Sequence, residues 1–229
     1  MIESELLPDN GLLLGVDTCG ASGSIALGRV SGQKVEVVSE AAIAGGEYAA
    51  SLIGKIAELL AAEGVTVREL AGIVAVAGPG SFTGIRIGLA AVKAMAEVAG
   101  LPVVTVSRLA LLADAGQAAT AVLDAHRGQF YCGMYDGVET REMLLTAGEI
   151  NAMGGLAGRV AVCEETVAQL LEELYGEPEI VRLEAPSAAA ALRFSLEKWR
   201  AGDVADVASL DGYYLRGADA KVSTGARLG

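Results

Sequence analysis

Residues 72–84 read Gly-Ile-Val-Ala-Val-Ala-Gly-Pro-Gly-Ser-Phe-Thr-Gly, and they contain the strand and turn from which the expected fold follows. Residues 72–77 form a continuous apolar run, which is typical of a strand that is covered on both faces. Residues 78–81, rich in glycine and proline, turn the chain. A helix is expected over residues 82–99 and a second apolar strand over residues 103–106. This part of the chain therefore alternates strand and helix.

Three further strands and one helix are expected on the N-terminal side. Segments rich in branched residues at 12–17, 24–28 and 35–39 are separated by breaks that contain glycine and serine. They indicate a three-stranded antiparallel meander. Between residues 47 and 63, apolar side chains recur at helical spacing and predict an amphipathic helix. An antiparallel start followed by alternation indicates a mixed sheet with helices packed on it.

The second half of the chain repeats part of this plan. We expect strands at 121–124, 129–135, 142–146 and 159–162, and helices at 164–175 and 186–201. In each half a strand that ends in aspartate, Asp17 or Asp124, leads through a glycine-containing turn into another strand. The sequence therefore predicts an α/β fold of two similar lobes, residues 1–108 and 109–229, each a mixed sheet with flanking helices.

Composition limits the compartment and the partners. Hydrophobic residues make up 52% of the chain, but no uninterrupted apolar stretch reaches the roughly 20 residues of a membrane span. The acidic start lacks the pattern of a secretory signal, and Cys19, Cys132 and Cys163 form no C-x-x-C pair. With 29 acidic against 17 basic residues, the chain is not expected to bind nucleic acid tightly by itself. We expect a cytoplasmic protein with reduced thiols and no membrane segment.

Side chains for several common catalytic mechanisms are missing. One histidine, His126, cannot build a two-histidine zinc site. No G-x-S-x-G nucleophile elbow occurs, because Ser81 lies in Pro-Gly-Ser-Phe-Thr, and no G-x-x-x-x-G-K-[ST] phosphate loop is present. The sequence therefore predicts no catalytic residue and no metal ligand.

The turn at residues 78–84 carries the most distinctive chemistry. Its backbone N–H groups and the hydroxyls of Ser81 and Thr83 lie where a helix N-terminus could hold an anion. Alternatively, Ser81 could cap the helix, and the glycines, among them Gly80 and Gly84, could permit a tight turn. The residues by themselves leave both interpretations open.

Five segments resemble, in order, the landmarks of one protein family. They are Leu12-Leu-Leu-Gly-Val-Asp-Thr18, Ser24-Ile-Ala-Leu27, Gly78-Pro-Gly-Ser-Phe-Thr-Gly-Ile-Arg-Ile-Gly88, Asp124-Ala-His-Arg-Gly128 and Tyr214-Leu-Arg216. The pattern spans nearly the whole chain and resembles the TsaB (YeaZ) family of bacterial subunits, which take part in making threonylcarbamoyladenosine in tRNA.

The resemblance implies an ASKHA fold with two actin-like, ribonuclease H-like lobes. It implies a non-catalytic scaffold for the paralogue TsaD, which transfers the threonylcarbamoyl group to the adenosine beside the anticodon, with the ATPase TsaE as a further partner. It implies no cofactor on this chain, because ATP and magnesium are used by the partner proteins. Because the chain is acidic, we also expect contact with tRNA only through the complex, and we expect a homodimer in isolation, in which the partner surface pairs with itself.

Two departures from the family pattern concern nucleotide binding. The chain has Gly46-Glu-Tyr48 where the family commonly has a histidine before the first long helix. It has Cys163-Glu-Glu165 where a Gly-Asp-Gly turn often precedes the late helix. The second departure brings two carboxylates to the place where the base and ribose of an ASKHA nucleotide would approach.

A vestigial nucleotide or anion site is one hypothesis. By resemblance, the first turn faces phosphate and magnesium in ATP-using relatives, and a second turn follows in the other lobe. The candidate residues are Asp17, Thr18, Gly80, Ser81, Thr83, Gly84, Asp124 and Arg127. The alternatives are an Asx or hydroxyl turn in the first hairpin and, in the second, a structural ion pair or a TsaD contact. A working site would make the chain an ATP-dependent, kinase-like enzyme for a small molecule.

The helix at residues 82–99 is the expected partner surface. Its charged residues Arg86, Lys93 and Glu97 share one stripe, while apolar side chains spread beyond the arc that covering a sheet requires. Gly84 and Gly88 form a small-xxx-small pair, which would let another helix or the sheet backbone approach closely, and the first helix is the expected neighbour. By resemblance the two helices join TsaD in a four-helix bundle through Leu52, Ile53, Ile56, Leu60, Ile85, Leu89, Val92 and Met95. The alternative is a core helix rich in alanine.

Overall fold

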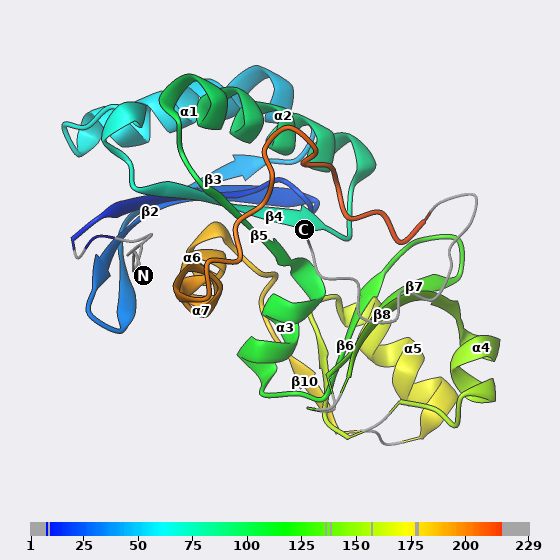
Figure 1. Cartoon of the computed structure of the whole chain (residues 1–229). Helices are drawn as coiled ribbons and strands as arrows, with labels where there is room; N and C mark the ends of the chain where they lie inside the picture. Colours follow the sequence, from blue (N-terminus) through cyan, green and yellow to red (C-terminus); the bar gives the residue numbers. More distant parts are fainter. Residues whose placement is uncertain are drawn as a thin grey trace. The chain divides into compact units, whose positions relative to one another are not determined.

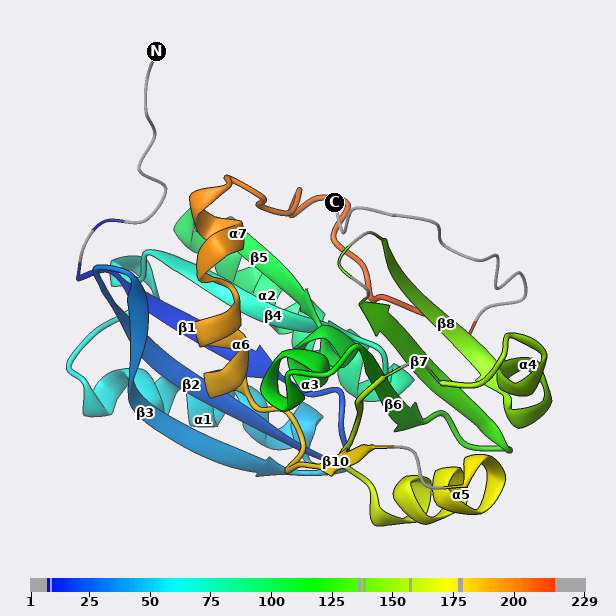
Figure 2. The same cartoon turned by 90° about the horizontal axis from the view of Figure 1, so that it is seen from below.

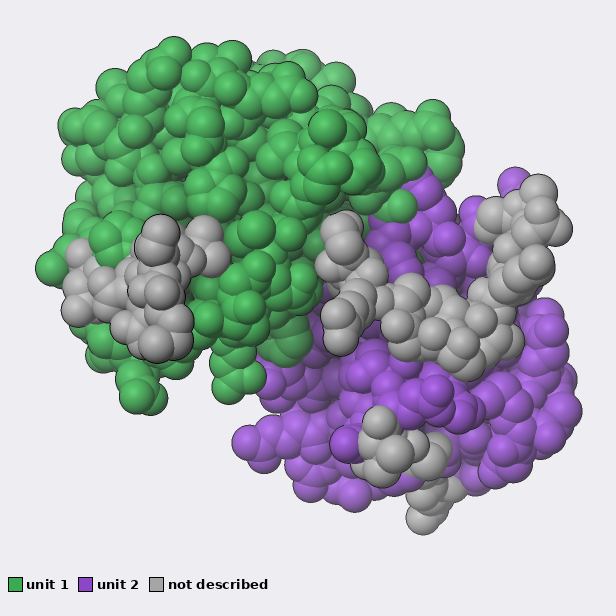
Figure 3. Space-filling view, viewed as in Figure 1, with its two compact units in different colours: residues 1–106, 187–212, 228–229 green, residues 107–186, 213–227 purple. Residues whose placement is uncertain are grey.

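The computed structural model describes residues 8, 10–135, 137, 139–156, 158–176 and 179–216. Most of the acidic start, on which the expectation about secretion rests, lies outside these residues. The described chain forms two compact units, distinguished by colour in Figure 3. Unit 1 holds the described residues up to Val106 together with Ser187–Gly212, and unit 2 holds Ser107–Pro186 together with residues 213–216.

Unit 1 is built on a five-stranded mixed sheet. Its strands are β1 (Leu12–Asp17), β2 (Ser22–Ser31), β3 (Lys34–Ala44), β4 (Gly72–Gly78) and β5 (Val103–Ser107), in the order β3-β2-β1-β4-β5. Strand β2 is antiparallel to both β1 and β3, whereas β1 and β4 are parallel. Every residue of β4 is buried, as the continuous apolar run predicts. The meander and the strand that follows the first helix are therefore confirmed.

Helices cover both faces of this sheet. Helices α1 (Tyr48–Ala62) and α2 (Phe82–Ala99) lie on one face, and α6 (Ala188–Phe194) and α7 (Leu196–Arg200) lie on the other (Figure 1). Figure 2 shows α6 crossing the central strands. Gly15 permits this close packing, because a Cβ atom there would lie 2.7 Å from the carbonyl oxygen of Ala188. A short 3₁₀ helix, η1 (Val67–Glu69), precedes β4.

Unit 2 repeats the topology of unit 1. Its strands are β6 (Thr120–Asp124), β7 (Gln129–Tyr135), β8 (Thr140–Thr146), β9 (Val160–Val162) and β10 (Ile180–Arg182), in the order β10-β9-β6-β7-β8. Strand β7 is antiparallel to β6 and β8, and β9 is parallel to β6 and β10. The helices are α3 (Arg108–Gly116), α4 (Ala147–Ala152) and α5 (Glu165–Tyr175). One core cluster lies under α3 and another under α5.

The helix that follows the fifth strand of each unit packs on the sheet of the other unit. Helix α3 follows β5 and packs on β6, β7 and β9, whereas α6 follows β10 and packs on β1 to β4. This exchange differs from the expected division into residues 1–108 and 109–229, because Ser187–Gly212 belongs to unit 1. Sequence order alone would keep that segment with its neighbours in the chain.

The predicted fold class is confirmed, since both units are mixed sheets with flanking helices. The expected helix at 186–201 is two helices that meet at Ser195. Helices α3 and α4 and strand β10 were not predicted. Among the residues that the structure describes, no helix is long and apolar enough to cross a membrane.

Candidate functional site

The turn between β1 and β2 packs directly against the N-terminus of α2. The Asp17 carboxylate accepts a hydrogen bond from the backbone N–H of Cys19 at 2.8 Å, which is an Asx turn. The Thr18 hydroxyl donates to the carbonyl oxygen of Gly84 at 2.8 Å, and the N–H of Ser81 donates to the carbonyl oxygen of Cys19 at 2.8 Å. Asp17 and Thr18 are buried. The turn is therefore fastened to α2 by its own polar groups.

Glycines make this close approach possible. A Cβ atom at Gly80 would overlap the Cys19 carbonyl, and one at Gly84 would overlap the Thr18 carbonyl. A Cβ atom at Gly88 would overlap the Thr18 hydroxyl. The β1–β2 turn is thus the nearest neighbour of the Gly84–Gly88 pair, and α1 contributes there through the ring of Tyr48, which would lie 3.2 Å from a Cβ atom at Gly84.

Ser81 caps α2. Its Oγ accepts a hydrogen bond from the N–H of Gly84 at 3.2 Å, as an N-cap serine does. The side chains of Ser81 and Thr83 are exposed. Two backbone donors of the segment, those of Ser81 and Gly84, are engaged within the chain. This geometry supports the capping interpretation of the segment over the anion-binding one.

Asp124 closes the corresponding turn of unit 2 in the same way. Its Oδ1 accepts from the N–H of His126 at 2.7 Å, and its Oδ2 lies 3.0 Å from Nδ1 of His126. Arg127 is exposed, with its backbone in the left-handed region at φ 59°. The acidic partner in this turn is therefore paired with His126, and Asp17 and Asp124 occupy equivalent positions in the two sheets.

Arg108 and Glu164 form a polar pair in unit 2, near the ends of strands β6 and β9. Arg108, which begins α3, is buried and lies close enough to Glu164 to influence its ionisation. Burial raises the pKa of Glu164, and the Arg108 guanidinium opposes that rise. Arg108 was not singled out from the sequence, because nothing around it distinguishes a buried arginine from an exposed one at a helix start.

The three cysteines are enclosed to different degrees. Cys19 and Cys132 are buried, and Cys163 is partly buried. Burial raises the pKa of the Cys132 thiol to about 12, and burial together with the Glu164 charge raises that of Cys163 to about 12. The Cys19 thiol donates to the carbonyl oxygen of Val76 at 3.2 Å. Within the described residues, no group of three or more His, Cys, Asp and Glu side chains is arranged to hold a metal ion.

The expected partner residues divide into a buried and an accessible set. Six are buried inside unit 1, namely Leu52, Ile56, Leu60, Ile85, Leu89 and Val92. Ile53 is 58% exposed and Met95 is partly exposed. The buried six form the inner stripes of α1 and α2, which pack on the sheet and on each other. Those six side chains are therefore not accessible to a partner, and of the eight expected interface residues only Ile53 and Met95 are.

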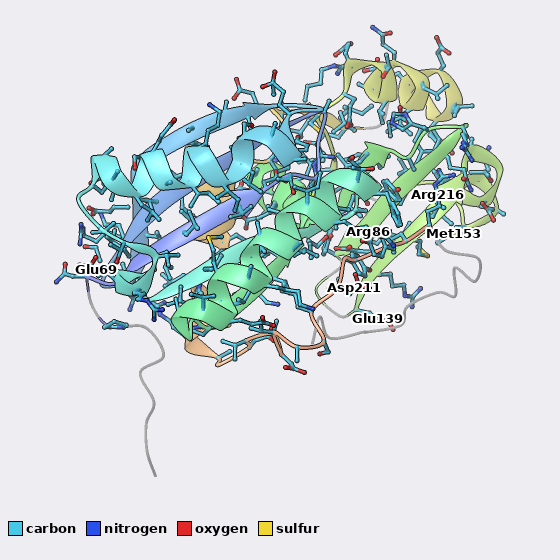
Figure 4. All side chains as sticks on the ribbon, turned by 90° about the horizontal axis from the view of Figure 1, so that it is seen from above. Glu69, Arg86, Glu139, Met153, Asp211 and Arg216 are labelled. Carbon is cyan, nitrogen blue, oxygen red and sulfur yellow. The ribbon has the colours of Figure 1, made fainter. Side chains whose placement is uncertain are left out.

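The outer face of the α1–α2 layer is nevertheless poor in charge. Figure 4 looks onto this face, where α1 and α2 lie side by side across the sheet. Its exposed small and large apolar residues, together with Arg86, are Ala50, Ile53, Gly54, Ala57 and Ala61 on α1, and Phe82, Arg86, Ala90, Ala94 and Val98 on α2, and the exposed acids Glu58 and Glu97 lie beside them on the two helices. The Arg86 guanidinium lies 3.8 Å from the centre of the Phe82 ring. We call these ten residues the outer helix face.

Comparison with known proteins gives the family. A family model described as "TsaD: tRNA N6-adenosine threonylcarbamoyltransferase" matches residues 39–176, which is more than half of the chain. The tRNA threonylcarbamoyladenosine biosynthesis protein TsaB of Bacillus subtilis is 40% identical over 72 residues, covering 30% of this chain and 31% of that protein. The TsaB protein of Haemophilus influenzae is 30% identical over 128 residues, covering 53% of this chain and 52% of that protein. The chain belongs to the TsaB (YeaZ) family.

The fold of the family agrees with that of the chain. The solved structure of YeaZ from Pseudomonas aeruginosa matches with a TM-score of 0.71 at 24% identity, covering 90% of this chain and all of that one. The chain spans about a third to a half of the length of the curated relatives it matches. Three of the segments that resemble the family can now be described in structural terms. Segments 12–18 and 124–128 contain the two equivalent Asx turns, and segment 78–88 is the glycine-rich turn and helix start against which the first Asx turn packs.

Proposed function

We propose that the chain is a non-catalytic subunit in the biosynthesis of threonylcarbamoyladenosine in tRNA, and that it works by binding a TsaD-type paralogue. The TsaB names of its relatives support a role in this pathway. The observation that carries the subunit role is the outer helix face, which gathers exposed apolar and small side chains on two adjacent helices. Three of the large exposed hydrophobic residues of unit 1, Ile53, Phe82 and Val98, belong to it.

The outer helix face has the composition of a surface for another helical layer. Small residues at Ala50, Gly54, Ala57, Ala90 and Ala94 let a facing helix approach closely. The stacked Phe82 and Arg86 are of residue types that are enriched at protein interfaces. We infer that TsaD packs two helices on this face. Without TsaD, a second copy of the chain would cover the same face in a two-fold dimer.

Two further proposals concern tRNA and nucleotide. They rest on the net charge of the chain and on hydrogen bonds that its polar groups make within unit 1. With a net charge of −12, the chain would contact tRNA only through the assembled complex. The groups of the first turn that could face magnesium and phosphate, the Asp17 carboxylate and the Thr18 hydroxyl, already form hydrogen bonds within unit 1. We therefore propose that ATP and magnesium are used by partner proteins, among them a TsaE-type ATPase, and that the eight candidate anion-site residues serve the fold here.

Co-purification with the TsaD paralogue tests this function. Ile53→Glu or Ala94→Glu would bury an unpaired carboxylate in the proposed interface, at a cost of about 3 kcal/mol. We expect affinity for TsaD to fall by about 100-fold or more. Val38→Glu is the matched control, because Val38 is 39% exposed on β3 of the same unit and lies outside both helices.

Two results would contradict the proposal. One is a folded Ile53→Glu chain, with wild-type circular dichroism, that still binds TsaD at wild-type strength. The other concerns the ATP-dependent alternative, for which calorimetric titration of the isolated chain with magnesium-ATP is the measurement. Micromolar binding accompanied by turnover would favour the kinase-like enzyme.

A further inference from the structure

The turn between β6 and β7 carries two exposed arginines. Residues 124–128 read Asp-Ala-His-Arg-Gly, and residues 126, 127 and 128 all have left-handed backbone, at φ 60°, 59° and 72°. The Arg216 guanidinium donates to the carbonyl oxygens of Ala125 and His126, which fastens it to this turn. Arg127, within the turn, and Arg216 are both exposed. The two arginines therefore belong to one place on the surface of unit 2.

Neither of these arginines forms an ion pair with a carboxylate among the described residues. The acid of the turn, Asp124, is held by the backbone N–H and the Nδ1 atom of His126. The other exposed arginines of unit 2, by contrast, each pair with a glutamate, and they are Arg141, Arg159 and Arg182. The turn thus holds the guanidinium groups of this unit that have no carboxylate to neutralise them.

The charge of this turn is opposite in sign to that of the whole chain. Two arginines stand against one aspartate, while the chain has a net charge of −12. The next carboxylate, that of Glu164, lies close enough to Asp124 to influence its ionisation, and the buried Arg108 opposes it. Because the chain as a whole repels anions, an anion that binds here must do so through local contacts.

The chemistry of the turn fits the phosphates of an extended polyanion. A guanidinium group has a rigid fork of N–H donors that matches the oxygens of a phosphate. Sites for small molecules are concave and enclose most of the ligand, whereas Arg127 and Arg216 lie exposed on a turn. RNA is a long chain of phosphates that can be held at many separate points, and the names of the relatives include tRNA.

We propose that Arg127 and Arg216 contact the phosphate backbone of tRNA when the chain is part of its complex, an inference that rests on the proposed function. Arg127 serves the fold through its left-handed backbone, which leaves its side chain for this contact. Arg216 uses one nitrogen, Nη2, for both carbonyl oxygens. Such a contact positions the RNA without reading its sequence. Two phosphates supply a small part of the affinity, so the partner proteins must supply the rest.

A titration of the isolated full chain tests the contact without TsaD. The probe is an RNA hairpin with the sequence of a tRNA anticodon arm, added at low salt. We expect the Nε–Hε NMR signals of Arg127 and Arg216 to shift, and those of Arg159 and Arg182 to stay in place. Inorganic phosphate and ATP, added at the same concentration of phosphate groups, should produce much smaller shifts.

The second measurement uses the complex with the TsaD paralogue and a full-length tRNA. Arg127→Gln should lower the affinity for tRNA by about tenfold per tenfold fall in salt, because the slope of log affinity against log salt should decrease by about one. Arg159→Gln is the matched control, since it removes the same charge from an exposed arginine of unit 2 and should leave the slope unchanged. Arg127→Lys keeps the charge and should keep the slope.

Four results would overturn the proposal. They are unshifted Arg127 and Arg216 signals with the RNA hairpin, equal shifts with ATP or inorganic phosphate, equal slopes in Arg127→Gln and Arg159→Gln, and weaker binding of TsaD itself by Arg127→Gln in the absence of RNA. The last result would assign the arginines to a protein contact. A chain that does not bind TsaD at all would contradict the proposed function, while the NMR titration would still decide the phosphate contact.

Discussion

Replacing Gly88 with alanine tests whether the β1–β2 turn is seated in α2. The added methyl group would occupy the place of the Thr18 hydroxyl, which donates to the carbonyl oxygen of Gly84 at 2.8 Å. The turn would have to withdraw, because both partners are buried. In Thr18→Ala the same space becomes free, so Gly88→Ala should then be tolerated.

The expected magnitudes follow from three opposing contributions. Alanine gains about 1 kcal/mol of helix propensity over glycine. Overpacking costs about 1–3 kcal/mol, and loss of the buried hydrogen bond costs about 1 kcal/mol more. Gly88→Ala should therefore destabilise unit 1 by about 1–3 kcal/mol. The double variant with Thr18→Ala should be no less stable than Thr18→Ala alone, which gives a coupling energy of about 2 kcal/mol.

Urea unfolding followed by tryptophan fluorescence measures the double-mutant cycle of Gly88→Ala and Thr18→Ala, because the fluorescence reports on unit 1. Trp199 is the one tryptophan of the sequence, is 1% exposed, and packs over Gly72 in unit 1. Gly54→Ala is the matched control. Gly54 is exposed on α1, and a Cβ atom added there would meet no other group within 4 Å, so alanine should stabilise by about 0.5–1 kcal/mol.

The reasoning would be refuted if Gly88→Ala stabilised the chain as Gly54→Ala does, or if Thr18→Ala did not suppress its cost. A second comparison sharpens the result. At Gly84 the obstacle is the backbone carbonyl of Thr18, which no side-chain substitution removes. Gly84→Ala should therefore remain destabilising in the Thr18→Ala background.

Three shorter predictions concern reactivity, packing and capping. With pKa values of about 12, Cys132 and Cys163 should react with a disulfide reagent at about pH 8 at least about 100-fold more slowly in the native chain than in urea, and fast native labelling would contradict their enclosure. Gly15→Ala should lose about 1–3 kcal/mol in the same unfolding assay, because its methyl group would press on the backbone of α6 2.7 Å away; an unchanged midpoint would argue against that packing. Ser81→Ala removes the cap of α2 and should cost about 1 kcal/mol, whereas no loss would mean that the cap is dispensable.

Local patterns predicted the elements of the first sheet well. The apolar run at 72–77 and the helical spacing at 82–99 correspond to β4 and α2 within one residue. An Asx turn at Asp17 was one of two alternatives for the first hairpin, and the structure contains it. These features depend on neighbours in the sequence, which is why periodicity and turn chemistry reveal them.

Features that depend on distant segments were not predictable in this way. Helix α2 carries large apolar side chains on the stripe that faces the core and mostly small ones on its outer stripe. The apolar pattern used to predict the partner surface therefore selected residues such as Leu89, which face the core. One local feature was missed as well, namely the pairing of Asp124 with His126 in a turn where residues 126 and 127 have left-handed backbone.

The exchange of α3 and α6 between the sheets bears on how the chain is made. A ribosome that has released residues 1–106 has produced a sheet covered by α1 and α2 on one face only, because α6 and α7 come from residues after Ser187. Strands β6 to β10 with α3, α4 and α5 form one uninterrupted stretch, Ser107–Pro186. The usual order in which the N-terminal part of a chain folds first is thereby inverted. Apart from residues 213–216, the unit synthesised second can fold as soon as Pro186 has been made, while the unit synthesised first keeps an apolar face exposed to chaperones until α6 and α7 follow.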